Sequence, residues 1–445
     1  MIRLVIRPLI RAAALALALA APAAPARAGI EIVRVTSPGG IEAWVHEDHS
    51  IPILTIAAGF PGGALLDPEG REGATYLMAA LLQEGAGGLD ASAFAVAGEE
   101  LAAHMSFWAT DDAVGFGATM LADERQETVE LLRLALTEPR FDAEAVERLR
   151  AQVLASIHAA AADPGSVGAH AFYADAFPGH PYGRPTNGTL ESVAANGVDD
   201  LRRAHAAALT RDRLHVAVVG AIRPDEVGPL LDRLLGDLPE AGRALPPPVE
   251  PSLSGDTSVI DFDTPQSLVV FGNDGLRSGD PDLIPALVMD YILGGGGFGS
   301  RLTAEMREKR GLTYGVYTYL ATHRLAGLYM GSFSSSNDRV AAALAILRAE
   351  WERMATGGVT DAELASAKRF LTGDYALRFD GNGSVAGELL RVQLAGLGLD
   401  SINDRNALVE AVTAADIARV ARRLLSSEAL TAVVVGRPEG IAPGR

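Results

Sequence analysis

Apolar and polar positions follow two different periods along the chain, and this predicts an α+β protein. Short β-branched apolar runs bounded by Gly, Pro or Asp predict strands at residues 53–58, 214–220 and 268–272. Longer Ala-, Leu- and Arg-rich stretches with helical spacing predict helices at residues 127–137, 143–160 and 340–354. We therefore expect sheets with helices packed on one face.

The same order of elements occurs twice. Asp67-Pro68-Glu69 corresponds to Asp280-Pro281-Asp282 at an offset of 213 residues, and Val218-Val219-Gly220 corresponds to Val434-Val435-Gly436 at 216. Two matches at nearly one offset predict two copies of one domain. A proline-rich stretch divides the copies. The predicted organisation is a signal peptide at residues 1–28, an N-terminal domain at 29–244, a linker at 245–251 and a C-terminal domain at 252–440.

The first 28 residues predict export. Arg3, Arg7 and Arg11 precede an Ala/Leu run that ends in Ala26-Arg27-Ala28, the pattern of a secretory signal with its cleavage site. The run is too short to cross a bilayer, so we expect no membrane span and a periplasmic or secreted protein. The alternative is a mitochondrial transit peptide, because the three Arg recur every four residues.

Composition removes several classes of function. A formal net charge of −18 disfavours nucleic acid and anionic membranes as partners. The chain has no Cys, so it has neither a thiolate nucleophile nor a Cys-based zinc site. A metal would need His and carboxylate ligands.

Two local motifs are better explained by structure than by chemistry. His46-Glu47-Asp48-His49 precedes Ile51-Pro52 and predicts a solvated hairpin turn. Gly294 to Gly299 contains a G-x-G-x-x-G pattern, but residues 283–293 before it are helical in pattern. A dinucleotide fingerprint needs a strand there, so we expect a flexible helix end instead.

Residues 293–302, LGGGGFGSRL, and 305–314, EMREKRGLTY, resemble the C-terminal-half signature of the insulinase-type (M16) zinc peptidase family. Residues 180–189 resemble that family's N-terminal-half segment, and the resemblance spans essentially Gly29 to Gly436. It implies an α+β fold of two homologous M16-type (LuxS/MPP-like) domains. Each would be a mostly antiparallel sheet with helices on one face, and the linker would join them into a clamshell half.

The resemblance also implies that the zinc site of this chain is vacant. The family carries H-x-x-E-H on a helix after a Gly turn, and a third ligand Glu further on. Here Tyr76 and Ala80 occupy the two His positions, Ala79 occupies that of the base, and Ala155 or Ser156 that of the third ligand. Zinc hydrolysis needs three ligands and a base, so we expect no metal and no cofactor in this chain.

Another part of the family's active site is retained. By resemblance, Arg307 and Tyr314 contact the substrate backbone and stabilise the tetrahedral intermediate at a partner's zinc site, and Gly295, Gly296 and Gly297 bind substrate. Spacing alone allows another interpretation: an Arg paired with Glu305 or Glu308, and a Tyr in a core.

We therefore expect the non-catalytic subunit of a heterodimeric M16 metallopeptidase that cleaves peptides. It would be active only with a subunit that carries H-x-x-E-H and zinc. One alternative is a wholly non-catalytic peptide-binding or scaffold protein. Another is a homodimeric hydrolase with an unrecognised site, involving His180 and Glu191. Phe107 and Trp108 would either block the local cleft or belong to the core.

Overall fold

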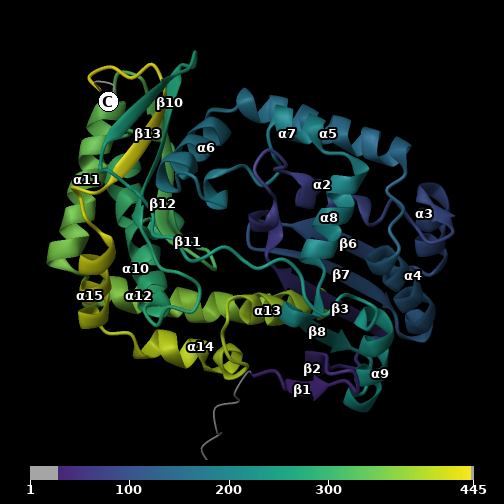
Figure 1. Ribbon diagram of the computed structural model, residues 1–445. Coiled ribbons are helices and arrows are strands. Elements are labelled where there is room, and N and C mark those ends of the chain that lie inside the picture. Colours follow the sequence, from purple (N-terminus) through teal and green to yellow (C-terminus); the bar gives the residue numbers. More distant parts are fainter. Residues whose placement is uncertain (1–28, 442–445) are drawn as a thin grey trace, which may run out of the picture. The chain divides into compact units, whose positions relative to one another are not determined.

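Each half of the chain builds one sheet, as the computed structural model shows for residues 29–441 (Figure 1). The first sheet has the order β1-β2-β8-β3-β7-β6 and the second β11-β12-β10-β13-β9. The strands of the first are β1 Val33–Thr36, β2 Glu42–Glu47, β3 Ile53–Pro61, β6 His104–Ala109, β7 Ala113–Leu121 and β8 His215–Gly220. Those of the second are β9 Thr257–Asp261, β10 Gln266–Asp274, β11 Val316–Thr322, β12 Gly327–Ser336 and β13 Thr431–Gly436. A separate ribbon pairs β4 Gly85–Ala86 with β5 Leu89–Asp90.

The two sheets follow one plan. In the first, β8 runs antiparallel to β3 and parallel to β2. In the second, β13 runs antiparallel to β10 and parallel to β9 in the same way. Both β8 and β13 end at a glycine with positive φ, +125° at Gly220 and +151° at Gly436. The repeat in the sequence is therefore a repeat of the fold, and the predicted α+β class with two copies of one domain is confirmed.

Helices of its own half cover one face of each sheet, and one helix of the other half packs on the opposite face. Those of the first half are α2 Ala74–Leu81, α3 Ala91–Glu100, α4 Arg125–Thr137, α5 Ala143–Ala161, α6 Pro164–Ala176, α7 Leu190–Ala195, α8 Val198–Ala208 and α9 Pro224–Leu235. Those of the second are α10 Leu283–Asp290, α11 Val340–Gly357, α12 Asp361–Tyr375, α13 Asn382–Leu394, α14 Asp400–Ala411 and α15 Ala414–Leu424. Fully buried apolar side chains fill both layers, for example Ile56 and Phe116 in the first and Phe271 and Trp351 in the second. Burying each such side chain stabilises the fold by about 1.5–3 kcal/mol.

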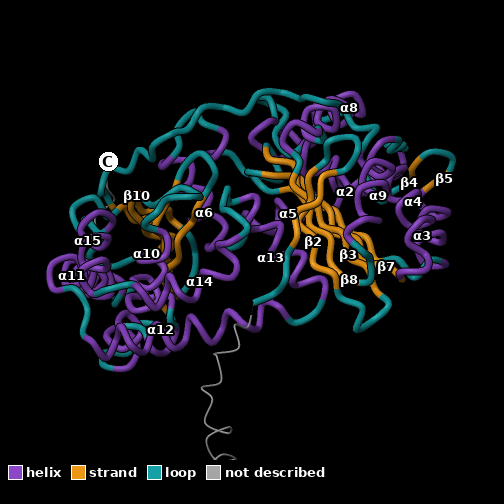
Figure 2. The backbone as a smooth tube through the Cα atoms, turned by 90° about the horizontal axis from the view of Figure 1, so that it is seen from below, coloured by secondary structure: helices purple, strands orange, loops and turns teal. Residues whose placement is uncertain are grey.

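The halves exchange one helix each. Helix α6 packs on β10 and β13 of the second sheet, and α13 packs on β3 and β8 of the first (Figure 2). Gly168 lets α6 approach closely, because a Cβ there would lie only 3.0 Å from a Val270 methyl. The Gln393 amide of α13 donates to the Val216 carbonyl at 3.0 Å. As a result, residues from Glu31 onward form one compact unit.

The segment 46–49 corrects the sequence analysis. It was expected to be a hairpin turn, but β8 lies between β2 and β3, so the two strands it connects are not paired with each other. His46 and Glu47 belong to β2, and His49 hydrogen-bonds the Glu47 carboxylate at 2.8 Å on the surface. The predicted signal peptide lies outside the described residues, and within the described part no helix is long and apolar enough to cross a membrane.

Candidate functional site

Helix α2, where the family places its zinc motif, is firmly anchored at its amino end. Gly73 has φ +82°, and a Cβ there would overlap the Asn187 carbonyl. The Thr75 backbone N–H and hydroxyl donate to Asp67 at 3.1 and 2.5 Å. Burial raises the pKa of Asp67 to about 6. The scaffold of the motif is thus intact.

The side chains on that scaffold offer little to a metal. Tyr76 is 38% exposed, Ala79 is buried and Ala80 is half-buried. On α5, Ala155 and Ser156 are exposed, and the Ser156 hydroxyl donates to the Val153 carbonyl at 2.8 Å. Among the described residues, no three His, Cys, Asp or Glu side chains are grouped so that they could hold a metal ion.

The glycine-rich loop of the second half follows a helix, as the sequence analysis expected when it rejected a dinucleotide site. Helix α10 continues into a π-helical turn, Tyr291–Gly295, and then a 3₁₀ turn, Gly297–Gly299. A Cβ at Gly295 would overlap the Asp290 carboxylate, and one at Gly296 would overlap the Tyr291 carbonyl. The prediction of a helix end at which glycines let the backbone approach other groups closely is therefore confirmed at these two positions. At Gly297 the requirement is φ +58°.

A buried carboxyl group anchors the base of this loop. Asp290 accepts hydrogen bonds from the Thr318 hydroxyl at 2.5 Å and from the Tyr329 hydroxyl at 3.0 Å. Burial raises the pKa of Asp290 to about 7. The loop is thereby tied to β11 and β12.

Arg307 lies between two exposed aromatic rings. Its guanidinium carbon is 4.6 Å from the ring centroid of Phe298 and 4.6 Å from that of Tyr314. Phe298 is 73% exposed and Tyr314 is 86% exposed. Stacking on aromatic rings leaves the N–H groups at the edge of the guanidinium free to donate.

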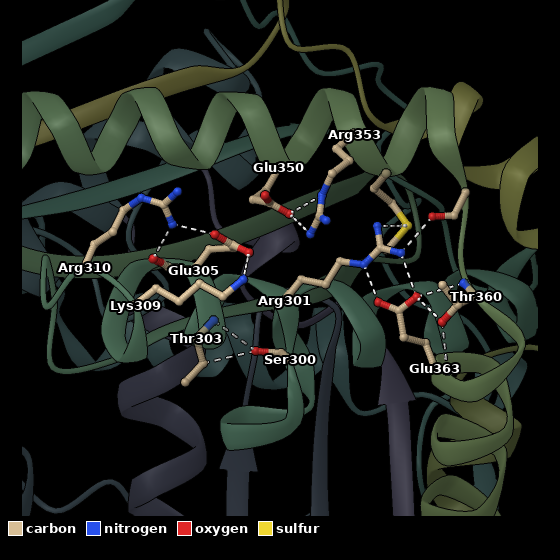
Figure 3. A network of polar contacts seen from close by, with 12 residues as sticks. Ser300, Arg301, Thr303, Glu305, Lys309, Arg310, Glu350, Arg353, Thr360 and Glu363 are labelled. Carbon is tan, nitrogen blue, oxygen red and sulfur yellow. Dashed lines mark hydrogen bonds and ion pairs between the residues drawn. The ribbon is translucent and has the colours of Figure 1, made fainter.

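The Glu305 carboxylate, two residues from Arg307, is engaged elsewhere, as Figure 3 shows. Glu305 pairs with Lys309 at 2.6 Å and with Arg310 at 2.5 Å. Within the described residues, no carboxylate pairs with Arg307. The alternative of an Arg307 ion pair and a core Tyr314 is therefore wrong.

An ion pair fixes the chain just after the loop. The Arg301 guanidinium binds both carboxylate oxygens of Glu363, at 2.6 and 2.8 Å, and donates to the Gly358 carbonyl (Figure 3). Arg301 holds the pKa of Glu363 down at about 2. Glu363 also forms a capping box with Thr360 at the start of α12. The start of the segment that carries Arg307 is thus held in place.

Sequence reasoning missed Phe298 as a member of this group. Its signal was available: a large apolar residue placed between Gly297 and Gly299 in a run of glycines has little chance of being buried. The structure brings Phe298, Arg307 and Tyr314 together. In the part of the chain that it describes, no hydrogen bond or ion pair links them to Tyr76, Ala79 or Ala80.

The residues of the second alternative do not form a site. The His180 Nδ1 accepts from the Tyr182 backbone N–H at 3.2 Å, and Glu191 is exposed in the first turn of α7. Among the residues described, no hydrogen bond or ion pair joins His180 to Glu191. The segment 180–189 instead braces the fold, with Arg184 pairing with Glu72 at 3.0 Å.

Phe107 and Trp108 point to opposite faces of the edge strand β6. Phe107 packs against Phe116, with ring centroids 6.3 Å apart, on the helix-covered face. Trp108 rests on Gly115 on the other face. Phe107 therefore belongs to the core, as one of the two expectations had it, whereas Trp108 lines a cavity.

Two family models match the chain, one after the other along the sequence. The family model "Insulinase (Peptidase family M16)" matches residues 44–190, and "Peptidase M16 inactive domain" matches residues 197–371. The non-peptidase homolog YmxG of Helicobacter pylori is 28% identical over 75% of this chain and 77% of its own length. An uncharacterized zinc protease of Streptomyces coelicolor is 27% identical over 90% of this chain and 89% of its own.

A solved structure gives the same result. The crystal structure of a peptidase M16 inactive domain from Pseudomonas fluorescens superposes with a TM-score of 0.87 at 25% identity, covering 94% of this chain and all of that one. The two halves of the chain thus match the two domain models of one family over most of its length. The protein belongs to the insulinase-type M16 peptidase family.

Proposed function

We propose that this chain is the non-catalytic subunit of a two-chain zinc metallopeptidase that cleaves peptides. A partner of the same family supplies H-x-x-E-H, the zinc ion and the general base. This chain supplies Arg307 and Tyr314, and Gly295 to Gly297 border the bound peptide. It contributes no cofactor of its own.

The unpaired Arg307 guanidinium carries the proposal. A surface Arg with nothing to bind normally extends into water, whereas this one is held between Phe298 and Tyr314 at 4.6 Å from each ring. Its free edge and the Tyr314 hydroxyl are hydrogen-bond donors suited to a peptide carbonyl that gains negative charge during hydrolysis. Helix α2, in contrast, has Tyr and Ala where the zinc ligands and base would be.

The proposed location is the periplasm or the exterior of the cell, on the basis of the N-terminal signal pattern. The division of roles between two subunits is supported by the names of two relatives, since one is named a non-peptidase homolog and the other a zinc protease.

The test is reconstitution. This chain, a relative that carries H-x-x-E-H, and their mixture are assayed on a fluorogenic peptide, with and without a zinc chelator. The proposal expects chelator-sensitive cleavage that is at least tenfold faster in the mixture than in the relative alone. Cleavage by this chain alone would contradict it, and a mixture no faster than the relative alone would favour the scaffold function.

A further inference from the structure

The cavity lined by Trp108 lies on the face of the first sheet that points away from α2. Its volume is about 650 Å³. Alternate residues of β6, namely His104, Ser106 and Trp108, line it together with helix α13 and the turn between β11 and β12. This size suits a ligand of a few residues.

Trp108 provides the cavity with an aromatic surface. A Cβ at position 115 would overlap the Trp108 ring, so the strand uses a glycine there to seat the indole. The ring is half-buried, and the side chains of Leu390 and Leu394 from α13 line the same cavity. These three residues form a surface for an apolar side chain.

One basic side chain of the lining, Arg324, is available to an anionic ligand. In the described part of the chain, no carboxylate lies within ion-pair distance of the exposed Arg324 guanidinium. Of the other charged groups of the lining, Arg391 pairs with Glu388 at 2.6 Å. The Asp112 carboxylate accepts hydrogen bonds from the Tyr182 hydroxyl at 2.5 Å and from the Arg324 backbone N–H at 3.1 Å.

We propose that this cavity binds the carboxyl-terminal residue of a short peptide. Arg324 binds the terminal carboxylate, and Trp108 and the two leucines contact an apolar side chain. Hydroxyl groups in the lining suit the amide groups of a peptide: Ser106 donates to the Gly117 carbonyl at 3.4 Å and keeps its lone pairs as acceptors. A fatty acid would leave such groups without partners.

Tryptophan fluorescence tests the proposal on this chain alone, independently of any partner subunit. Of the three tryptophans, Trp44 and Trp351 are buried, so Trp108 reports on the cavity. The probes are the peptide Ala-Ala-Ala-Leu as free acid, the same peptide as carboxyl-terminal amide, and octanoate. We expect a saturable change with the free acid, and an affinity weakened about tenfold or more by amidation or by Arg324→Gln, because a charge-assisted hydrogen bond is lost.

Arg369→Gln is the matched control, since Arg369 is an exposed Arg outside the cavity, and it should bind like the wild type. Arg324→Gln keeps the backbone N–H that donates to Asp112, so it should fold normally, which circular dichroism checks. Trp108→Phe should abolish the fluorescence change, while calorimetry still detects binding. Equal affinity for acid and amide, no effect of Arg324→Gln, or binding of octanoate without the peptide would overturn the proposal.

Discussion

The two halves of this chain share one fold but differ in the side chains of their candidate sites, α2 in the first half and the Arg307 group in the second. In the first half, α2 keeps its anchored glycine turn, but Ala79 is packed into the core and Ala80 is half-buried. In the second half, the glycine-rich loop and the segment that follows it expose Phe298 and Tyr314, and the unpaired Arg307 stacks on both rings. Exposed aromatic side chains bury little apolar surface, so they add little to folding.

The fold of the first half is therefore kept although the residues of the family's zinc site are absent from it. The anchor of α2 at Asp67 serves the core and remains although the metal positions are gone. The Arg307 group serves no core and forms no ion pair within the described residues, so folding does not account for its arrangement. The proposed contact of Arg307 with a peptide would account for it.

The largest expected effect comes from restoring the vacant site. Tyr76→His and Ala80→His, combined with a Glu at either 155 or 156, should change zinc content from none to about one ion per chain in at least one version, because the two His positions lie one helical turn apart. Elemental analysis after dialysis measures this, with Tyr76→His alone as the control. Folded variants without zinc would show that the backbone, too, has diverged.

Asp290→Asn should remove a pH dependence of stability that originates in the second half. The folded pKa of about 7 lies above the unfolded value of 3.8, so the folded chain keeps a proton that the unfolded chain has released between these pH values. Wild-type stability should therefore fall relative to the variant as pH rises from about 4 to about 7, by at most about 4 kcal/mol. Urea midpoints at several pH values measure the difference, and parallel curves would contradict it.

Phe298→Ala should lower kcat/KM of the reconstituted complex about fivefold, which corresponds to about 1 kcal/mol of cation–π stacking lost from Arg307. The loss should be mainly in kcat if Phe298 positions Arg307, and mainly in KM if the ring only contacts the peptide. Leu377→Ala, which removes another side chain that is 73% exposed, is the control and should have no effect.

Tyr76→Ala should have the smallest effect. Because the Tyr76 ring is exposed, its removal should change the free energy of unfolding by less than about 0.5 kcal/mol, as thermal unfolding measures. The activity of the complex should not change. A large loss of activity would contradict this account, because it would show that Tyr76 on α2 contributes to peptide cleavage.

Local patterns predicted much of this structure. The helices at α4, α5 and α11 and the core strands followed from periodicity, because each packs one apolar face. The prediction failed at residues 46–49, because insertion of β8 between β2 and β3 depends on chain far away in sequence. The exchange of α6 and α13 is non-local in the same sense.

Some residues of the candidate site could be predicted from the sequence and others could not. Arg307 and Tyr314 were found by resemblance, since their spacing carries no signal of its own. Phe298 was missed because its meaning lies in a stack with residues nine and sixteen positions away. The opposite directions of Phe107 and Trp108 were predictable, because neighbouring residues of a strand always face opposite ways.

The most direct test of the account compares wild type, Arg307→Ala and Arg310→Ala in the mixture with a subunit that carries H-x-x-E-H. Arg310 is the matched control, because it is exposed and already paired with Glu305. The account predicts that Arg307→Ala lowers kcat about 10²- to 10³-fold without preventing assembly, while Arg310→Ala stays close to wild type. Equal activity of all three complexes would contradict the shared active site.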